Sequence, residues 1–316
     1  MKILITGASG FVGSHIVEQA LAERHEVWAA LRPSSSRQWL TDPRIRTVLL
    51  DEVLVGEGRY DAVVWCAGIT KALRDEDFET VNYRQIRQWV EALRERGRLP
   101  RVFLYMSSLS ARYPKSAYGR SKLHAAEWLR QQRDFVPVIL YPTGVYGPRD
   151  RDYLEQFRIV GSHCDFVPGI SGEQKLTFIY VRDLARVVMQ SLQVAWNKEE
   201  GPCIEMEVSE PRTYGNREFR QLLQTEFAVS EGRGWWVLPL RVPIWLMYVI
   251  CWCSGAMARW RGKPALLNGD KVKMLSQRDW SADGTQMKRW LGNISLTPLQ
   301  EGLHETFLWY KSHGWL

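Results

Sequence analysis

MKILITGASGFVGSHIVEQAL, residues 1–21, runs from a short apolar segment through a glycine-rich turn into an amphipathic helical pattern. Gly7, Gly10 and Gly13 stand three residues apart, where the predicted first strand gives way to the predicted first helix. The first glycine permits a tight turn, the second lets the backbone approach a phosphate, and the third allows the helix to pack closely on the strand. Free N–H groups at the start of such a helix attract a pyrophosphate. This stretch therefore predicts a dinucleotide-binding turn.

Short apolar runs alternate with helical patterns through the first half of the chain. Six such runs occupy residues 1–6, 27–31, 46–50, 62–66, 101–106 and 136–141. Helical patterns extend to residue 22 and cover residues 78–96 and 118–133. The runs are rich in Val, Ile and Leu rather than alternating, which is typical of parallel strands covered on both faces. The fold class predicted is α/β, a Rossmann doubly wound parallel sheet with a smaller C-terminal substrate domain.

The regular alternation ends near Pro148, after which Pro and Gly interrupt the chain. One further strand-helix pattern, at 177–192, resembles those of the first half. We therefore expect an NAD(P)-binding domain formed by residues 1–148 plus 177–198. The substrate-binding domain is expected to comprise residues 149–176 plus 199–316.

The composition is that of an ordinary globular protein, with 45% hydrophobic and 24% charged residues in a chain of 316. A net charge of +7 is interpreted as scattered solubilising arginine, with an anionic ligand or membrane surface as the alternative. No run of five or more Lys and Arg occurs, so no nucleic-acid partner is expected. The five cysteines show neither a paired framework nor zinc spacing, which predicts reduced thiols and no metal site. The chain opens on a strand rather than a signal peptide, so a cytoplasmic location is expected.

Residues 244–258 form the most hydrophobic stretch, with fifteen residues that carry no charge between Arg241 and Arg259. A helix that spans a bilayer needs about 20 apolar residues. The stretch therefore predicts a buried helix in a domain core or dimer interface. Since Trp and basic residues flank it, a helix in peripheral contact with a membrane surface is the alternative.

The end of the second predicted strand, in EVWAALRPSSSR at 26–37, bears on the choice of cofactor. An acidic residue at this place hydrogen-bonds the ribose of NAD, whereas an Arg accommodates the 2′-phosphate of NADP. Arg32 stands here, and Ser34, Ser35 and Arg37 follow as further donors. The sequence therefore predicts NADP, with NAD still possible if Arg32 is only a solvated loop residue.

Several other positions are expected to contact the cofactor. Those in the first turn are Gly7, Ser9, Gly10, Phe11, Val12 and Gly13. Asp51, at the end of the third predicted strand, is placed near the adenine. Ala67 and Gly68, in CAGIT at 66–70 after the fourth strand, are placed beneath the cofactor ribose.

YMSSLSARYPKSAYGRSKL, residues 105–123, follows the fifth predicted strand and carries the candidate catalytic residues. Tyr118 and Lys122 are four apart, so they share a face of a helix. Tyr has an ordinary pKa near 10 and is a poor base, but an adjacent ammonium favours the phenolate. Ser108, at the carboxyl end of the strand, can hydrogen-bond a substrate oxygen. The segment predicts a proton-transfer site.

These motifs together resemble the extended short-chain dehydrogenase/reductase family. They are the Gly-x-x-Gly-x-x-Gly start, the Ser-Ser pair, Tyr-x-x-x-Lys and YPTGVYGP at 141–148. The similarity extends to TFIYVRDLA at 177–185 and to the ending at 296–316. It is nearest to bacterial members that are dihydroflavonol-reductase-like or 3β-hydroxysteroid-dehydrogenase-like.

The resemblance implies a role for each matching residue. Tyr118 is the acid/base, Lys122 holds the nicotinamide ribose and lowers the Tyr pKa, and Ser108 polarises the carbonyl. Asn82, in TVNYRQ, is structural support near the cofactor.

The resemblance also places Tyr141 and Thr143 close to the nicotinamide. This chain departs from the family pattern in carrying Tyr141 where Arg is usual and Tyr180 where His is usual. Relatives often pair through helices, which predicts a homodimer.

The residues that follow Ser108 bear on the reaction. Leu109, Ser110 and Ala111 stand where 4,6-dehydratases carry an Asp-Glu pair, and only nine residues separate Ser108 from Tyr118. The second domain is rich in Trp, which suits a hydrophobic small-molecule substrate. We predict an NADP(H)-dependent oxidoreductase that interconverts a secondary alcohol and a ketone. The alternatives are a nucleotide-sugar epimerase or reductase, and a non-catalytic NADP-sensing protein.

Overall fold

The computed structural model describes residues 1–168, 173–198, 203–243, 245–247, 249–252 and 277–316. The chain divides into two compact units, each with its own hydrophobic core. The first unit comprises Met1–Pro142, Arg182–Val208 and Asp283–Ile294. The second comprises Thr143–Val181, Ser209–Ala282 and Ser295–Leu316.

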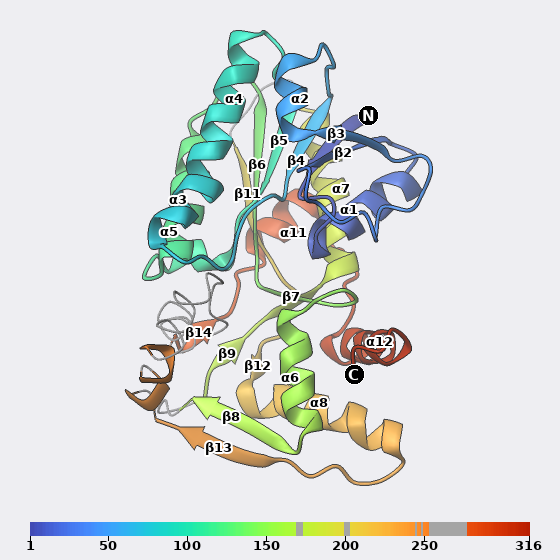
Figure 1. Cartoon of the computed structure of the whole chain (residues 1–316), viewed down its shortest axis with the longest axis vertical. Coiled ribbons are helices and arrows are strands. Elements are labelled where there is room, and N and C mark those ends of the chain that lie inside the picture. Colours follow the sequence, from blue (N-terminus) through green and yellow to red (C-terminus); the bar gives the residue numbers. More distant parts are fainter. Residues whose placement is uncertain (169–172, 199–202, 244, 248, 253–276) are drawn as a thin grey trace. The chain divides into compact units, whose positions relative to one another are not determined.

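The first unit is built on a seven-stranded parallel sheet in the order β11-β6-β5-β4-β1-β2-β3 (Figure 1). The strands are β1 (Lys2–Thr6), β2 (Glu26–Leu31), β3 (Arg46–Leu49), β4 (Ala62–Trp65), β5 (Val102–Met106), β6 (Val136–Pro142) and β11 (Ile204–Val208). The six apolar runs of the sequence each become one of the first six strands. This order confirms the predicted Rossmann-like doubly wound sheet.

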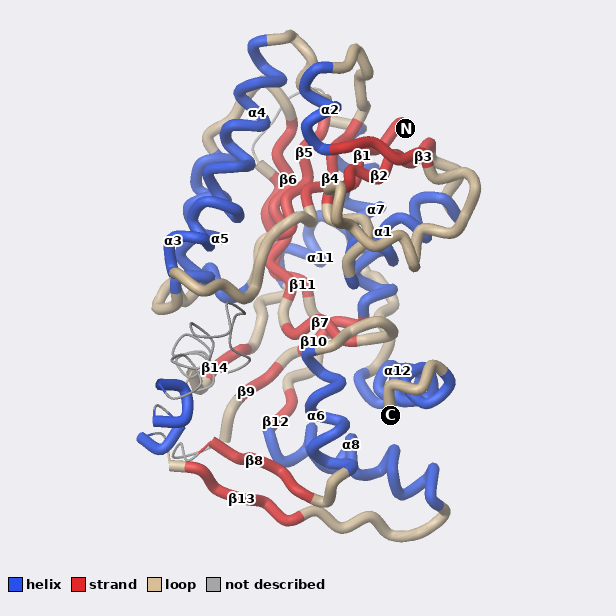
Figure 2. Tube along the Cα trace, in the orientation of Figure 1, coloured by secondary structure: helices blue, strands red, loops and turns tan. Residues whose placement is uncertain are grey.

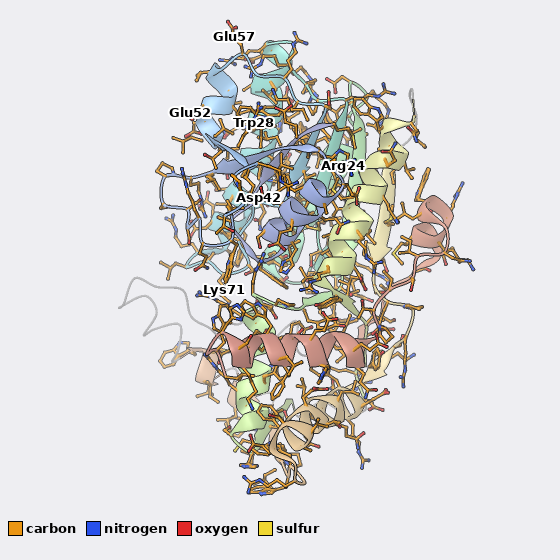
Figure 3. The ribbon with its side chains drawn as sticks, turned by 90° about the vertical axis from the view of Figure 1, so that its right-hand side faces the viewer. Arg24, Trp28, Asp42, Glu52, Glu57 and Lys71 are labelled. Carbon is orange, nitrogen blue, oxygen red and sulfur yellow. The ribbon has the colours of Figure 1, made fainter. Side chains whose placement is uncertain are left out.

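Helices cover both faces of this sheet. They are α1 (Phe11–Ala22), α2 (Leu50–Val55), α3 (Asp75–Glu79), α4 (Gln85–Glu95), α5 (Ala117–Arg130), α7 (Val181–Trp196) and α11 (Thr285–Leu291). Figure 3 shows α1 and α7 in front of the strands, on the face opposite to α4 and α5. Strands enclosed in this way are apolar on both sides, which explains their continuous hydrophobic runs.

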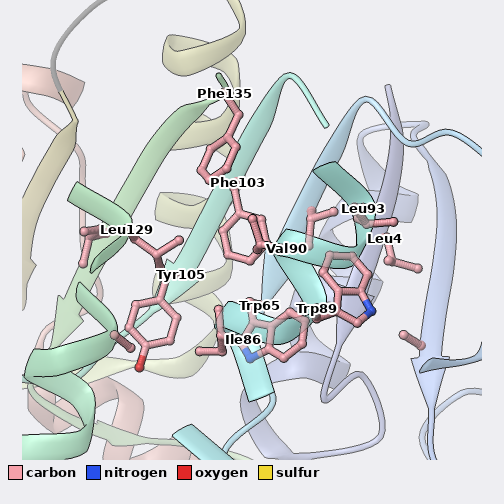
Figure 4. Packing of buried hydrophobic residues seen from close by; sticks show 14 of the residues in the cluster. Leu4, Trp65, Ile86, Trp89, Val90, Leu93, Phe103, Tyr105, Leu129 and Phe135 are labelled. Atoms are coloured by element: carbon pink, nitrogen blue, oxygen red, sulfur yellow. The ribbon is translucent and has the colours of Figure 1, made fainter. Parts of the chain in front are cut away.

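Large aromatic side chains form the core between the sheet and α4 and α5 (Figure 4). Trp65 of β4 lies edge-on to Trp89 of α4, with ring centroids 5.2 Å apart, and stacks on Phe103 of β5 at 6.1 Å. Phe103 in turn contacts Phe135 at 5.5 Å. Full burial of one such side chain stabilises the fold by about 1.5–3 kcal/mol. This packing holds β4 and β5, whose carboxyl ends carry candidate site residues, against one helical layer.

In the part of the chain that the structure describes, the second unit combines short strands with three longer helices and a short helical segment at 245–247 and 249–252 (Figure 2). The strands are β7 (Gly144–Tyr146), β8 (Cys164–Pro168), β9 (Lys175–Leu176), β10 (Phe178–Tyr180), β12 (Tyr214–Gly215), β13 (Leu238–Val242) and β14 (Asp279–Trp280). They form the sheets β10-β7, β12-β9-β14 and β13-β8. The helices are α6 (Asp152–Gly161), α8 (Asn216–Glu231) and α12 (Leu299–Ser312). Aromatic residues join them, with Phe178 stacked on Phe219 at 4.8 Å and Phe157 edge-on to Tyr310 at 5.5 Å.

The structure corrects the predicted domain boundaries. Residues 199–208 were assigned to the second domain, but β11 pairs in parallel with β6 and therefore extends the sheet of the first unit. Conversely, β10 pairs with β7 in the second unit, so the first unit resumes only at Arg182. Helix α11 also belongs to the first unit.

For the described part of 244–258, the prediction of a helix buried in the domain core is wrong, whereas its place in a dimer interface stays a prediction. Residues 245–247 and 249–252 are helical, whereas 244, 248 and 253–258 lie outside the described residues. Cys251 is buried, but Trp245 and Trp252 are 68% and 72% exposed. Among the described residues of this segment, one buried position is too few for a helix of the domain core.

Gly13 offers a test of the contact between α1 and the first turn. A Cβ at this position would lie 2.2 Å from the carbonyl oxygen of Gly7 and 2.8 Å from its carbonyl carbon. Both are backbone atoms, so Gly13→Ala forces the turn and the helix apart. We expect it to lower the free energy of unfolding, measured in urea, by about 1–3 kcal/mol.

Gly58→Ala is the matched control, because a Cβ there would meet its nearest atom, the Tyr60 hydroxyl, at 3.6 Å. The urea concentration at the midpoint of its unfolding should stay close to that of the wild type. Equal midpoints for the two variants would show that the turn does not require glycine at position 13.

Candidate active site

The candidate site lies where β1 and β4 run side by side. The connection after β1 leads through α1 to β2 and β3, toward one edge of the sheet. The connection after β4 leads to β5 and β6, toward the opposite edge. In open α/β sheets, ligands bind outside the carboxyl ends of the strands at such a switch point. The Ala67 N–H donates to Thr6 Oγ1 at 3.1 Å, and a Cβ on Gly7 would lie 2.9 Å from the Ala67 nitrogen. The two turns are therefore in direct contact.

The glycine-rich turn forms an open helix start. Gly7 has a φ of +66°, and its carbonyl oxygen accepts the Gly10 N–H at 2.9 Å. No side chain caps the start of α1, and the first turn contains no acidic residue. The first N–H groups of a helix lack partners within it and carry a partial positive charge. The turn that holds Ser9, Phe11 and Val12 therefore fits a pyrophosphate, and a Cβ on Gly7 or Gly13 would collide with backbone atoms next to it.

Asn82 ties the turn after β4 to α5. Its Oδ1 accepts the Ile69 N–H at 2.8 Å, and its Nδ2 donates to the Ile69 carbonyl and to Ser121 Oγ, each at 3.1 Å. Asn82 is completely buried in a π-helical turn, Thr80–Arg84, that separates α3 from α4. The sequence pattern predicted one helix over this region and gave no signal of the π turn. Asn82 has the supporting position that the family resemblance implied.

Lys122 lies beneath the same turn. Its Nζ donates to the Met106 carbonyl at 2.9 Å, lies 4.9 Å from the centroid of the Tyr105 ring, and is 3.3 Å from the place a Cβ on Gly68 would take. Burial lowers the pKa of Lys122 to about 8, and the nearby Cys66 partly opposes that change. Burial also raises the pKa of the Cys66 thiol to about 12. Lys122 is thus a buried amine next to the predicted ribose position.

Ser108 and Tyr118 precede this amine in the chain. Tyr118 is half-buried one helical turn before Lys122, and its ring lies edge-on to Phe78 with centroids 6.0 Å apart. Ser108 is half-exposed at the end of β5, and its Oγ accepts the Ser110 N–H at 3.2 Å. Because that bond uses only an oxygen lone pair, the Ser108 hydroxyl keeps its proton for donation.

Gly119 allows the short link between Ser108 and Tyr118 to pack on α5. A Cβ on Gly119 would lie 2.5 Å from the Ser110 carbonyl oxygen, within the 3₁₀ turn Leu109–Arg112. Ser116 caps α5, since its Oγ accepts the Gly119 N–H at 2.9 Å. The nine-residue link is thus a compact, capped connection.

Arg32 directly follows β2 and is exposed. A turn fixes its backbone, because the Arg32 N–H donates to Ser35 Oγ at 3.0 Å and its carbonyl accepts the Ser35 N–H at 2.9 Å. Asp42, which Figure 3 labels, lies further along the same loop, and Arg44 donates to both of its oxygens. This pairing lowers the pKa of Asp42 to about 2. The acidic group of the loop is thus engaged, and Arg32 is accessible.

Three other predicted cofactor residues are placed differently from the rest. Asp51 lies exposed in the first turn of α2, because β3 ends at Leu49. The Tyr141 hydroxyl donates to Glu205 at 3.0 Å and lies 3.4 Å from an Arg130 nitrogen, and burial beside that carboxylate raises its pKa well above the usual range. Thr143 belongs to the second unit. None of the contacts described above brings these three to Lys122.

The model of the NAD dependent epimerase/dehydratase family matches residues 3–203. The chain belongs to this family. It is therefore an NAD(P)-binding enzyme of the extended short-chain dehydrogenase/reductase type, an oxidoreductase or epimerase, as the motifs predicted.

The relatives within this family differ in how much of the chain they match. A ceramide reductase of Caulobacter vibrioides is 27% identical over 99% of this chain and 96% of its own. A sterol-4-alpha-carboxylate 3-dehydrogenase of Saccharomyces cerevisiae is 21% identical over 98% and 97%. A dTDP-4-dehydro-6-deoxy-D-allose reductase of Streptomyces bikiniensis is 30% identical over 60% of this chain and 72% of its own. The structure of a UDP-glucose 4-epimerase of Thermotoga maritima superposes over 99% of both chains with a TM-score of 0.73 at 19% identity, which establishes a shared fold.

The buried amine of Lys122 predicts a pH-dependent contribution to stability. Its pKa is about 8 in the folded state and about 10.4 in an unfolded chain, so between these values the unfolded state binds more protons. Stability therefore rises with pH across this window. Relative to Lys122→Met, the wild type should gain about 2 kcal/mol in free energy of unfolding between pH 7.5 and 10.

Urea unfolding at the two pH values measures this difference. Lys115→Met, which alters an exposed lysine, serves as the control and should follow the pH dependence of the wild type. If Lys122→Met also follows it, the amine of Lys122 is not desolvated in the folded protein.

Proposed function

We propose that the protein is an NADP(H)-dependent reductase that interconverts a ketone and a secondary alcohol on a long-chain lipid of the ceramide type. The observation that carries this proposal is the extent of the similarity. The ceramide reductase matches 99% of this chain, the second unit included, whereas the nucleotide-sugar reductase matches 60%. Substrate selection in a two-unit enzyme of this class depends on the unit outside the dinucleotide-binding sheet. A relative that matches both units is therefore the better guide to the substrate.

The chain's own residues provide the proton chemistry. A reduced nicotinamide, when bound, supplies a hydride to the carbonyl carbon. Ser108 donates its hydroxyl proton in a hydrogen bond to the carbonyl oxygen and polarises the bond. Tyr118 transfers its proton to that oxygen as negative charge develops on it. The ammonium form of Lys122 stabilises the phenolate left on Tyr118, and water restores the proton. The reverse sequence oxidises the alcohol.

Arg32 supports NADP as the cofactor. It stands at the end of β2, where an acid would select the ribose hydroxyl of NAD, and its guanidinium is accessible. The one acidic side chain described above in the following loop, Asp42, is held by Arg44. A 2′-phosphate at this position meets a positive charge without a competing free carboxylate.

The surroundings of Ser108 favour simple ketone reduction over more elaborate sugar chemistry. Leu109, Ser110 and Ala111 are buried and offer no carboxyl group next to Ser108. Elimination of a sugar hydroxyl requires an additional acid and base at this place. A nucleotide-sugar reductase or epimerase remains the alternative, because solved neighbours with the same fold bind UDP sugars. A non-catalytic NADP sensor is a minor alternative, since the proton-transfer pair is intact.

A substrate panel tests the proposal. NADPH oxidation is followed with the ketone analogue of ceramide in detergent micelles, a ketosteroid, and a nucleotide-linked 4-ketosugar. We expect kcat/KM for the long-chain ketone to exceed that for the ketosugar by at least about 10²-fold, because a pocket built for one lacks the other's polar partners. A preference for the ketosugar would establish the alternative.

Tyr118→Phe is the control for chemistry in this panel. It should bind NADPH as the wild type does, and turnover should fall by at least about 10²-fold, the typical loss of a general acid. Full turnover in this variant would exclude Tyr118 as the proton donor. NADPH binding without turnover of any ketone by the wild type would favour the sensor.

The cofactor preference is tested separately with Arg32→Glu. A carboxylate here attracts the ribose hydroxyls of NADH and repels the 2′-phosphate of NADPH, so the ratio of kcat/KM for NADPH over NADH should fall at least about tenfold. Arg37→Glu, five residues further along the loop, is the comparison. An unchanged ratio in Arg32→Glu would show that this arginine does not contact the phosphate.

A further inference from the structure

Exposed large apolar side chains are concentrated in one stretch of the second unit. Of the eleven such side chains among the described residues, seven fall between positions 236 and 252. These seven, which we call the tryptophan-rich surface, are Trp236, Leu238, Leu240, Trp245, Val249, Ile250 and Trp252. Single exposed apolar residues are normal on a protein, but a contiguous group marks a binding surface.

The local structure gathers these side chains on common faces. Leu238 and Leu240 are two apart on β13, so they point to the same side of the strand. Trp245, Val249 and Trp252 are four and three residues apart in the helical segment that follows, and therefore share one helical face. Figure 2 shows this segment as a short helix beyond the end of β13. The surface thus includes one face of a strand and one face of the helical segment that follows it in the chain.

The beginning of this surface is anchored in the core of the second unit. His163 lies stacked between Trp235 and Trp236, with ring centroids 4.1 and 4.6 Å apart, and its Nδ1 is 2.8 Å from the Trp236 carbonyl oxygen. The Trp235 indole N–H donates to the Val160 carbonyl at 3.0 Å, and its ring stacks on Phe227 at 5.2 Å. Trp236 is therefore exposed from a fixed position rather than from a frayed end.

The charge pattern around the surface selects its partner. From residue 232 to residue 269 the sequence contains no Asp or Glu. The basic residues in this stretch are Arg233, Arg241, Arg259, Arg261 and Lys263, of which the last three lie outside the described residues. Tryptophan favours the interface between lipid and water, and lysine and arginine are attracted to anionic headgroups. A second copy of this chain would instead bring like charges together.

We propose that the tryptophan-rich surface binds the face of an anionic phospholipid bilayer. Its apolar side chains enter the boundary between headgroups and acyl chains, and the net positive charge of the sequence at 232–269 attracts the anionic headgroups. The contact is peripheral, since none of the helices in the described part of the chain has the length and hydrophobicity to cross a bilayer. The proposal rests on this surface alone and does not require the substrate to be a lipid.

Vesicle sedimentation tests the proposal with the full-length protein. We expect it to bind vesicles of phosphatidylcholine and phosphatidylglycerol, to bind pure phosphatidylcholine vesicles more weakly, and to lose affinity in high salt. The double variant Trp245→Glu/Trp252→Glu should reduce partitioning to anionic vesicles at least about tenfold, because two negative charges replace two indoles that enter the bilayer when the protein binds. Val55→Glu, at a residue 77% exposed in the first unit, is the matched control and should bind as the wild type does.

Two further measurements keep the outcome unambiguous. Thermal unfolding and NADPH binding show whether the double variant is folded. If the double variant is not folded, the single variant Trp252→Ser is used in its place. Light scattering reports the oligomeric state of each protein. The proposal is overturned if the wild type does not bind anionic vesicles, or if folded variants bind them unchanged. It is also overturned if the substitutions split an oligomer and leave vesicle binding intact, since the surface would then join copies of the chain.

Discussion

The parallel pairing of β1 with β4, and the contact between the turns that leave them, is the constraint on which the site depends. Ile3 is in register with Ala62, and Thr6 with Trp65, so both strands end at the same level. The Thr6 hydroxyl then accepts the Ala67 N–H directly beyond the sheet. At this closeness Gly7 has no room for a side chain. The position of the helix start and that of the segment after β4 are therefore not independent, and a shift in one moves the other.

The segment after β4 is also connected to α5, the helix that carries Tyr118 and Lys122. Asn82 holds the segment after β4 with two hydrogen bonds to Ile69 and reaches Ser121 with a third. Ser121 precedes Lys122, whose amine sits under Gly68. A buried lysine loses the hydration that its ammonium form needs, so its charge depends on the few acceptors that remain, chiefly the Met106 carbonyl. The chain thus holds a buried amine with a lowered pKa one helical turn after Tyr118.

The sequence was sufficient to predict the first six strands, the glycine-rich turn and a helix that carries Tyr118 and Lys122, because each follows from a local rule of periodicity or backbone conformation. It did not reveal the π turn at Asn82, since the helical pattern continues through it. Nor did it place β11 in the first sheet, because pairing with β6 is a contact between distant segments. The partners of the Tyr141 hydroxyl, Arg130 and Glu205, have the same non-local origin.

Residues 244–258 show how hydrophobicity alone misleads. Burial of a helix requires a partner surface as well as apolar side chains, and among the described residues of this segment only Cys251 is buried. Exposure of an apolar segment to water costs free energy. An apolar segment that stays exposed in a folded unit therefore indicates a surface that binds a partner. A long-chain substrate raises the same problem, because such a molecule resides in a bilayer rather than in water. One bilayer contact would satisfy the apolar segment and bring the enzyme to the phase where a substrate of this class is concentrated.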